Sequence, residues 1–249
     1  MKNKLSKSTR WIGLLAVLLL GWMAAACQPS IIPAAQPTPR ILTVAVTPAL
    51  QPLSPIFQTC ANALDNTSLV VLDTPAQAID LKKSPLALRW GPAAAEYPYA
   101  AVLGQEELVM VVNPKNPIQH ISLADVKDIY TGTLRTWNGV SPAADINAWA
   151  YPGGDDVEAI FEKAVTGMPI STQLTSIAPD PNAMREAIAK DPWAVGFLPR
   201  RWLGATVKAV AIEGSTPSSL RQPILAISPS EPAGLEKSWL LCIQQRLKE

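Results

Sequence analysis

Short apolar runs alternate with amphipathic runs along the chain from residue 41 to its end. The apolar runs are rich in Val, Ile, Leu and Ala and predict strands, at residues 41–46, 68–72, 86–90, 107–112, 146–151, 173–177, 194–198, 207–212 and 222–228. The runs between them carry apolar residues at helical spacing and predict helices, at residues 48–64, 74–79, 123–131, 155–165, 181–190 and 233–248. Strands and helices that alternate in this way predict an α/β fold with mainly parallel strands.

The N-terminal segment has a different pattern. Basic residues come first and are followed by an apolar run over 11–26 that stops at Cys27. This order is typical of a secretory signal, and the run is shorter than the roughly 20 residues of a membrane helix. The sequence Ala24-Ala25-Ala26-Cys27 resembles a bacterial lipobox, so we expect residues 1–27 to be a lipoprotein signal peptide with Cys27 as the lipid site. An ordinary signal peptide or an uncleaved anchor is the alternative.

A proline-rich segment, residues 28–40, follows the predicted lipid site, with prolines at 29, 33, 37 and 39. Chain of this composition is extended and semi-rigid. We therefore expect it to be a tether between the membrane lipid and a folded part that begins near Ile41. A folded part of this length corresponds to one large domain or two small ones.

Composition excludes several classes of function. The 21 Lys and Arg residues are balanced by 20 Asp and Glu residues, which argues against a nucleic-acid surface. Three cysteines and one histidine are too few for an ordinary His/Cys zinc site. His120 follows a turn-like stretch and gives no Ser-His-Asp triad, and no nucleophile and base stand in a recognisable motif. We therefore expect no enzyme, no cofactor and no metal.

Two cysteines, Cys60 and Cys242, remain once Cys27 is assigned to the lipid. Each lies on the apolar face of a predicted helix, Cys60 with Phe57 and Cys242 with Trp239. An exported protein can form disulfides, and one that closes so long a loop stabilises by on the order of 4–5 kcal/mol in the chain-entropy model. Two alternatives stay open, a disulfide between Cys60 and Cys242 or two buried thiols.

One segment, residues 108–140, resembles the solute-binding proteins of phosphate ABC transporters. It contains an apolar strand followed by Asn-Pro-Lys-Asn-Pro at 113–117, Ile-Tyr-Thr-Gly at 129–132 and Thr-Trp at 136–137. Residues 191–199, DPWAVGFLP, match the family segment in which a helix leads into a glycine-containing strand. The resemblance implies a type II periplasmic-binding-protein fold, in which two α/β lobes joined by hinge strands close on a ligand.

The resemblance also implies where the two lobes lie in this sequence. Lobe one is expected to comprise residues 41–112 plus 221–249, and lobe two residues 113–220. Cys60 and Cys242 then fall on the first and last helices of the same lobe, which makes their pairing plausible. A protein of this family works as a monomer without chemistry of its own and passes its ligand to an ABC permease.

In such folds the ligand lies at the C-terminal ends of the strands. The first three strands here lead into Thr47-Pro48-Ala49, Asp73-Thr74-Pro75 and Arg89-Trp90-Gly91. In lobe two the Arg-Asp-Gly-Ser-Gly-Thr motif of the family is replaced by residues 150–156, AYPGGDD. Carried over position by position, the resemblance gives as candidate ligand-binding residues Thr47, Ala49, Thr74, Arg89, Trp90, Gly153, Gly154 and Asp155.

The replaced motif bears on the identity of the ligand. It lacks the arginine and the hydroxyl donors and instead carries Asp155 and Asp156. Two carboxylates repel phosphate in a partly dry cleft, so we expect another small polar solute, or an oxyanion bound by an altered site. These carboxylates also have a structural interpretation, which we favour: Asp155 as N-cap, Asp156 at N1 and Glu158 at N3 make an acidic first turn that suits the helix dipole.

Together, these patterns predict a lipid-anchored, extracytoplasmic solute-binding protein whose ligand is not simple phosphate. The alternative is a surface lipoprotein of the same fold that senses a ligand or docks to a protein partner without transport. The altered anion motif is the feature that favours this alternative.

Overall fold

The computed structural model describes residues 38–91, 97–137, 139–140, 142–171 and 173–248. The predicted signal peptide, the lipid site Cys27 and nearly all of the tether lie outside the described residues. Residues Pro39–Glu249 form one compact unit. Within the described residues, no helix is both long enough and apolar enough to cross a membrane.

The first section of the sheet is built around β1, Arg40–Val46. This strand lies between β2 (Thr67–Asp73) and β3 (Ala87–Trp90), and both pairings are parallel. Strand β10, Arg221–Ser228, then pairs antiparallel with β3. The last strand of the polypeptide thus returns to the section in which the first strand lies.

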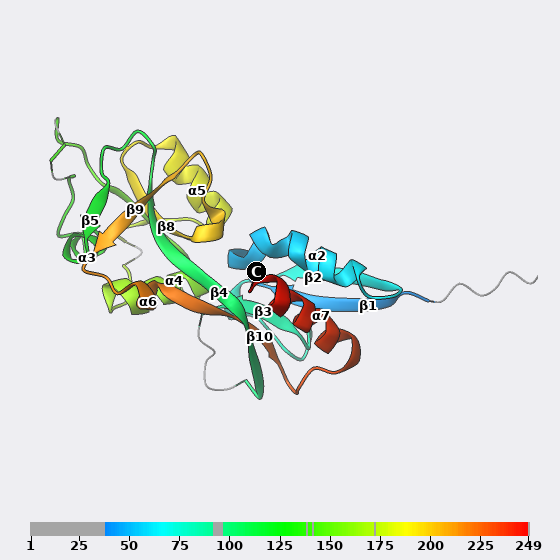
Figure 1. The fold of residues 1–249 in the computed structure, drawn as a ribbon. Coiled ribbons are helices and arrows are strands. Elements are labelled where there is room, and N and C mark those ends of the chain that lie inside the picture. The colour runs from blue at the N-terminus through cyan, green and yellow to red at the C-terminus, as the bar shows by residue number, and fades with distance from the viewer. Residues whose placement is uncertain (1–37, 92–96, 138, 141, 172, 249) are drawn as a thin grey trace, which may run out of the picture. The chain divides into compact units, whose positions relative to one another are not determined.

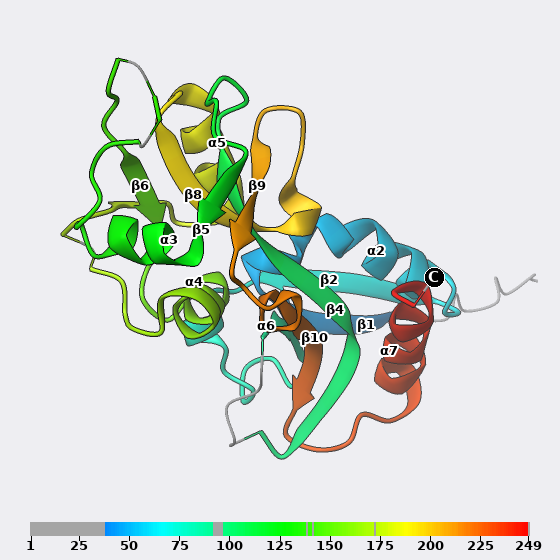
Figure 2. The ribbon, with the colours of Figure 1, turned by 60° about the vertical axis from the view of Figure 1, so that its left-hand side comes forward.

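The long strand β4, Tyr99–Val112, belongs to both sections of the sheet. Its residues 99–107 pair antiparallel with β10, and its residues 108–112 pair antiparallel with β8. Figures 1 and 2 show β4 and β10 crossing side by side between the two sections. The second section consists of the end of β4 together with β5 (His120–Ser122), β6 (Asn147–Ala150), β7 (Ser176–Ile177), β8 (Ala194–Pro199) and β9 (Lys208–Glu213).

The helices flank this sheet, and polar side chains cap several of them. The Ser122 side chain accepts a hydrogen bond from the backbone N–H of Asp125 at the start of α3. The Asp180 side chain accepts one from the backbone N–H of Ala183 at the start of α5. The helical elements are η2 (Pro48–Leu53), α2 (Ser54–Asn62), η3 (Ala76–Ala78), α3 (Leu123–Tyr130), α4 (Asp156–Phe161), the π-helical turn η4 (Glu162–Thr166), α5 (Pro181–Lys190), η5 (Arg200–Trp202), α6 (Pro217–Leu220) and α7 (Gly234–Arg246).

The structure differs from the predicted strands in four respects. Strand β4 begins at Tyr99, whereas the apolar run predicted only its buried end. The run 173–177 forms a strand only at Ser176–Ile177, and β5 was not predicted. The expectation of mainly parallel pairing holds on both sides of the sheet but fails in the middle, because β4 and β10 run antiparallel to their neighbours.

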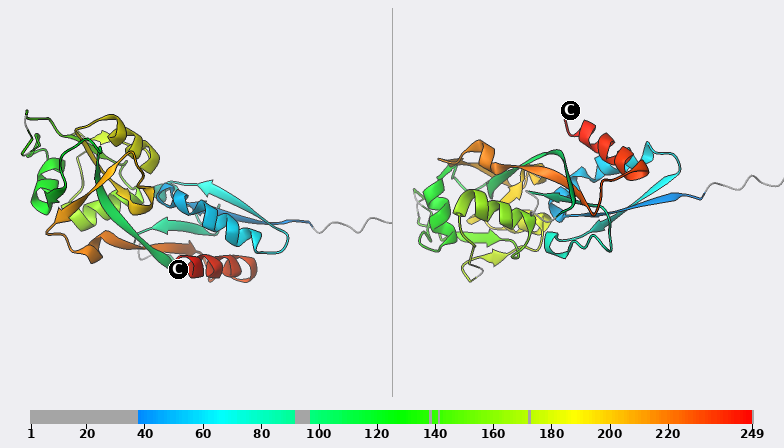
Figure 3. Two further views of the ribbon diagram at one scale, coloured as in Figure 1. Left: turned by 45° about the horizontal axis from the view of Figure 1, so that its top comes forward. Right: turned by 90° about the horizontal axis from the view of Figure 1, so that it is seen from below.

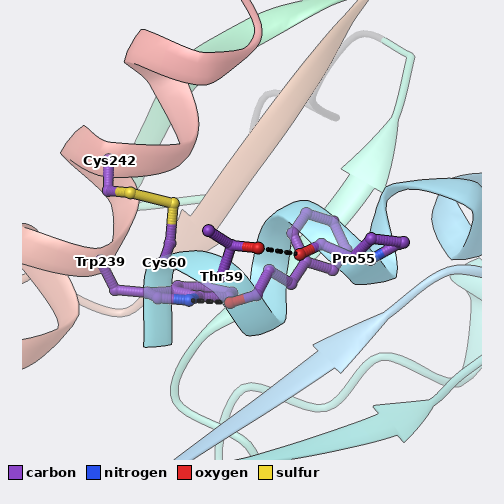
Figure 4. The surroundings of a disulfide bond; sticks show 6 residues. Pro55, Thr59, Cys60, Trp239 and Cys242 are labelled. Atoms are coloured by element: carbon purple, nitrogen blue, oxygen red, sulfur yellow. Dashed lines mark hydrogen bonds between the residues drawn. A yellow bond between two sulfur atoms is a disulfide. The ribbon is translucent and has the colours of Figure 1, made fainter. Parts of the chain in front are cut away.

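Helices α2 and α7 pack against each other on the first section of the sheet, and a disulfide joins them. Figure 3 shows the two helices side by side, and Figure 4 shows the bond between Cys60 and Cys242. The ring of Trp239 packs 5.8 Å from that of Phe57, and its indole N–H donates to the Phe57 carbonyl at 3.0 Å. The bond therefore joins two helices that also share an apolar contact and a buried hydrogen bond.

Candidate functional site

The carboxylate of Asp156 lies where the two sections of the sheet meet. Asp156 is the first residue of helix α4 in the second section, and only 1% of its surface is exposed. Its Oδ2 accepts a hydrogen bond from the backbone N–H of Trp90, at the end of β3 in the first section, at 3.0 Å. A carboxylate of one section is thus held by a backbone donor of the other.

Two further groups of the first section face this carboxylate. Burial is the largest influence on Asp156 and raises its pKa, whereas the Thr47 hydroxyl, the Trp90 N–H and the Arg89 guanidinium each lower it. Thr47 follows β1 and is fully buried. A hydroxyl, a backbone N–H and a guanidinium are groups that proteins use to bind an oxyanion. Here they surround a carboxylate of the protein itself.

This arrangement leaves some polar atoms without partners. Within the described residues, the buried side-chain atoms that lack a hydrogen bond of acceptable geometry are Thr47 Oγ1, Arg89 Nε and Asp156 Oδ1. The Thr47 hydroxyl lowers the pKa of Asp156, although it forms no well-aligned hydrogen bond to this carboxylate. Buried polar groups are nearly always paired, so an unpaired carboxylate oxygen with two unpaired donors near it makes this place a candidate site.

Asp155 and Glu158 flank Asp156 and are held within the second section. Asp155 is the N-cap of α4, and its Oδ1 accepts from the Val157 N–H at 2.8 Å, as the sequence predicts. Glu158 does not complete a capping box, because its Oε2 accepts from the Tyr151 N–H at 2.9 Å. Burial raises the pKa of Asp155 to about 7 and that of Glu158 to about 8. Repulsion from Asp156 contributes to the shift of Asp155.

A cavity of about 320 Å³ lies next to Asp156, between the two sections. The first section contributes the end of β3 and a residue of β10, the second contributes α4 and η4, and Ser219 comes from α6, just before β10. At Gly91 the backbone has φ +92°, and a Cβ there would lie 3.1 Å from Ile160. Glycine thus allows the end of β3 to pass closely under α4. The lining residues are Arg89, Trp90, Gly91, Asp156, Ala159, Ile160, Lys163, Ala164, Ser219 and Gln222.

The structure brings only some of the predicted ligand residues to this place. Thr47, Arg89 and Trp90 surround Asp156. The Ala49 side chain is buried, and its carbonyl accepts from the Trp202 indole N–H at 2.9 Å, a second bond between the two sections. The Thr74 hydroxyl donates to the nearby Leu72 carbonyl.

The glycines of the predicted motif lie in an exposed turn, where Asp155 N–H donates to the Pro152 carbonyl. No atom lies within 4 Å of a Cβ built at Gly153, and one built at Gly154 would meet Gln77. The sequence interpretation did not identify Lys163, Ser219 or Gln222 as lining residues. These residues lie far from β3 in the sequence, and no local sequence pattern indicates that their segments pack near it.

Comparison with known proteins identifies the fold. No protein-family model and no curated protein matches the sequence. Similar solved structures include a putative phosphate ABC transporter substrate-binding protein with bound phosphate from Clostridium perfringens, which is 16% identical, with 82% of this chain and 93% of that chain covered and a TM-score of 0.72. An ABC-type phosphate transport receptor from Vibrio cholerae is 17% identical over 82% and 93% of the two chains, with a TM-score of 0.60.

The same fold also occurs outside transport. The reduced OxyR regulatory domain from Pseudomonas aeruginosa is 11% identical over 83% of this chain and 98% of that chain, with a TM-score of 0.61. Similarity at this level of identity concerns the fold, and proteins of one fold serve different functions. The mixed sheet, the crossing strands β4 and β10 and these neighbours show that the chain has the type II periplasmic-binding-protein fold.

Proposed function

We propose that this chain is a lipid-anchored, extracytoplasmic solute-binding protein that works as a monomer and delivers a small polar solute to an ABC permease. Its two lobes correspond to the two sections of the sheet, with β4 and β10 as the hinge strands. The signal-like N-terminus, the lipobox-like residues before Cys27 and the proline-rich tether support the location. The fold of the neighbouring phosphate-transport proteins supports the mode of action.

The ligand in this proposal is not free phosphate, and the position of the Asp156 carboxylate is the observation that carries this step. Asp156 takes the Trp90 N–H and lies against Thr47 and Arg89. A phosphate would have to approach the same three groups, which already face this carboxylate. When Asp156 is ionised, phosphate would also be repelled at short range in a site of low effective dielectric. The protein thus supplies its own anion where an oxyanion would bind.

The alternative function is a sensor or protein-docking module of the same fold without transport. It is favoured by the bonds that join the two sections through groups of the chain itself, from Trp90 to Asp156 and from Trp202 to Ala49. If the two lobes close around the carboxylate of Asp156, the protein needs no solute to reach the closed state. The regulatory domain of OxyR is an example of this fold in a protein that is not a transport receptor.

Replacement of Asp156 by serine tests the assignment of the ligand. The Asp156→Ser variant is expected to gain phosphate or sulfate binding, because the Trp90 N–H, the Thr47 hydroxyl and the Arg89 guanidinium become free for an oxyanion. The measurement is thermal unfolding with increasing phosphate. An anion at about 100 times its dissociation constant stabilises the folded state by about 2.7 kcal/mol, whereas the wild-type protein is expected to show no such shift.

Asp155→Ser is the matched control, because Asp155 caps its own helix and accepts no hydrogen bond from the first section. It should leave the protein without phosphate binding. Phosphate binding by the wild-type protein would contradict the proposed exclusion of phosphate. If a broad set of amino acids, sugars, polyamines and organic acids also leaves the wild-type melting temperature unchanged, the docking alternative takes precedence.

A further inference from the structure

The cavity between the two sections combines cations with an apolar wall. Arg89 is half-buried on one side, and Lys163 is exposed on the other side, in η4. Neither side chain makes a hydrogen bond or an ion-pair contact with any described residue. Trp90, Ala159, Ile160 and the other apolar lining residues supply the rest of the surface.

An arginine in this position is unusual for a purely structural role. Its Nε is buried and has no partner, although a guanidinium has five N–H donors that are costly to leave unpaired. The other half-buried arginine among the described residues is Arg185, on α5. It donates to Asn182 and lies 5.6 Å from the Trp202 ring centroid. The Arg89 side chain makes no such hydrogen bond to a described residue, and it lines the cavity beside Asp156.

From this arrangement we infer that the cavity binds a small organic anion, with its anionic group between Arg89 and Lys163 and an apolar body against Trp90 and Ile160. The volume of about 320 Å³ lies at the lower end of the range for small-molecule sites, which limits the ligand to a compact molecule. This inference rests on the proposed function and names the class of solute.

The acidic group in the cavity does not contradict an anionic ligand. Asp156 presents Oδ2 to the Trp90 N–H, and its Oδ1 is buried without a partner. Two cations, Arg89 and Lys163, line the cavity together with this one carboxylate, so the lining is cationic on balance. The polar rim is completed by Ser219 and Gln222, where the Gln222 amide donates to the Ser219 carbonyl.

Calorimetric titration and thermal shift of the purified protein with benzoate, hexanoate and the neutral analogue benzamide test this inference. We expect the organic anions to bind and benzamide to bind at least about tenfold more weakly, because charge-assisted hydrogen bonds are worth roughly 1.5–3 kcal/mol. Arg89→Gln and Lys163→Gln should each weaken anion binding about tenfold or more. Ala159→Trp, which fills the cavity, should abolish anion binding while leaving the protein folded by circular dichroism.

Lys127→Gln is the control, because Lys127 is an exposed lysine on α3 away from the cavity. Equal binding of benzoate and benzamide, or anion binding that survives both Arg89→Gln and Ala159→Trp, would overturn the inference but leave a solute-binding function standing. Binding of a neutral solute or a cation in place of the anions would likewise overturn the inference and leave a solute-binding function standing. If inorganic phosphate binds instead, both the inference and the proposed exclusion of phosphate fail.

Discussion

Removal of the Cys60–Cys242 disulfide is expected to lower the free energy of unfolding by about 5 kcal/mol. The bond joins residues 182 positions apart, and the loss of chain entropy that such a cross-link imposes on the unfolded state grows with the logarithm of the loop length. The folded state should change little, because Trp239 still packs on Phe57 and donates to its carbonyl. The effect therefore arises mainly in the unfolded chain.

The measurement is chemical denaturation of the wild-type protein and of Cys60→Ala, Cys242→Ala and the double variant. Either single change breaks the bond, so all three variants should lose nearly the same stability and should no longer respond to a reducing agent. Titration of free thiols in the wild-type protein shows whether the bond is intact at the start. A loss of only about 1 kcal/mol from an intact bond would mean that the unfolded chain is already compact.

The fold could be predicted from the sequence where the signal is local. A buried strand such as β8 or β1 is a short apolar run, and the helices at 123–131 and 181–190 begin at residues with capping side chains. The first half of β4 escaped prediction because most of its residues are half-buried or exposed and give no apolar run, and its pairing with β10 depends on residues more than 100 positions away. Long-range pairing of this kind leaves no local pattern.

Only one rule allowed the candidate site to be predicted: in such folds the ligand lies at the C-terminal ends of the strands, which meet at one edge of the sheet. This rule, applied through the family resemblance, selected Thr47, Arg89 and Trp90, which the structure places around a single carboxylate. It also selected Gly153, which lies in an exposed turn. The sequence favoured a local capping role for Asp156, whereas its hydrogen bond crosses to the other section. The difference is physical: a cap can be read from spacing, but a bond to a residue 66 positions away depends on how the sections meet.

The protein is expected to be markedly less stable at pH 8.5 than at pH 5. Burial raises the pKa of Glu158 from 4.5 to about 8 and that of Asp155 from 3.8 to about 7, and it also raises the pKa of Asp156. Between pH 4 and 8 the folded state therefore holds protons that the unfolded state has released. The stabilisation that this provides is fully present below the unfolded pKa values and is lost as the pH rises through the folded ones.

The size of the effect is large for a single group. A shift from 4.5 to about 8 at Glu158 corresponds to on the order of 4 kcal/mol, and Asp155 contributes in the same direction. Glu107 acts in the opposite sense, since its hydrogen bond with Arg200 lowers its pKa. That contribution is lost only as the pH falls into the acid range, so a comparison between pH 5 and pH 8.5 isolates the buried acids.

Glu158→Gln identifies the group responsible. Glutamine keeps an oxygen to accept the Tyr151 N–H but cannot ionise, so the variant should lose much less stability between pH 5 and pH 8.5 than the wild-type protein. Glu186→Gln, on the exposed face of α5, is the matched control and should behave like the wild type. Denaturation at a series of pH values gives the slope directly, because the slope measures the difference in bound protons between the two states. A stability that is flat or rises with pH across this window would show that these carboxylates are solvated in the folded protein, and the closed contact between Asp156 and Trp90 would then not describe its dominant state.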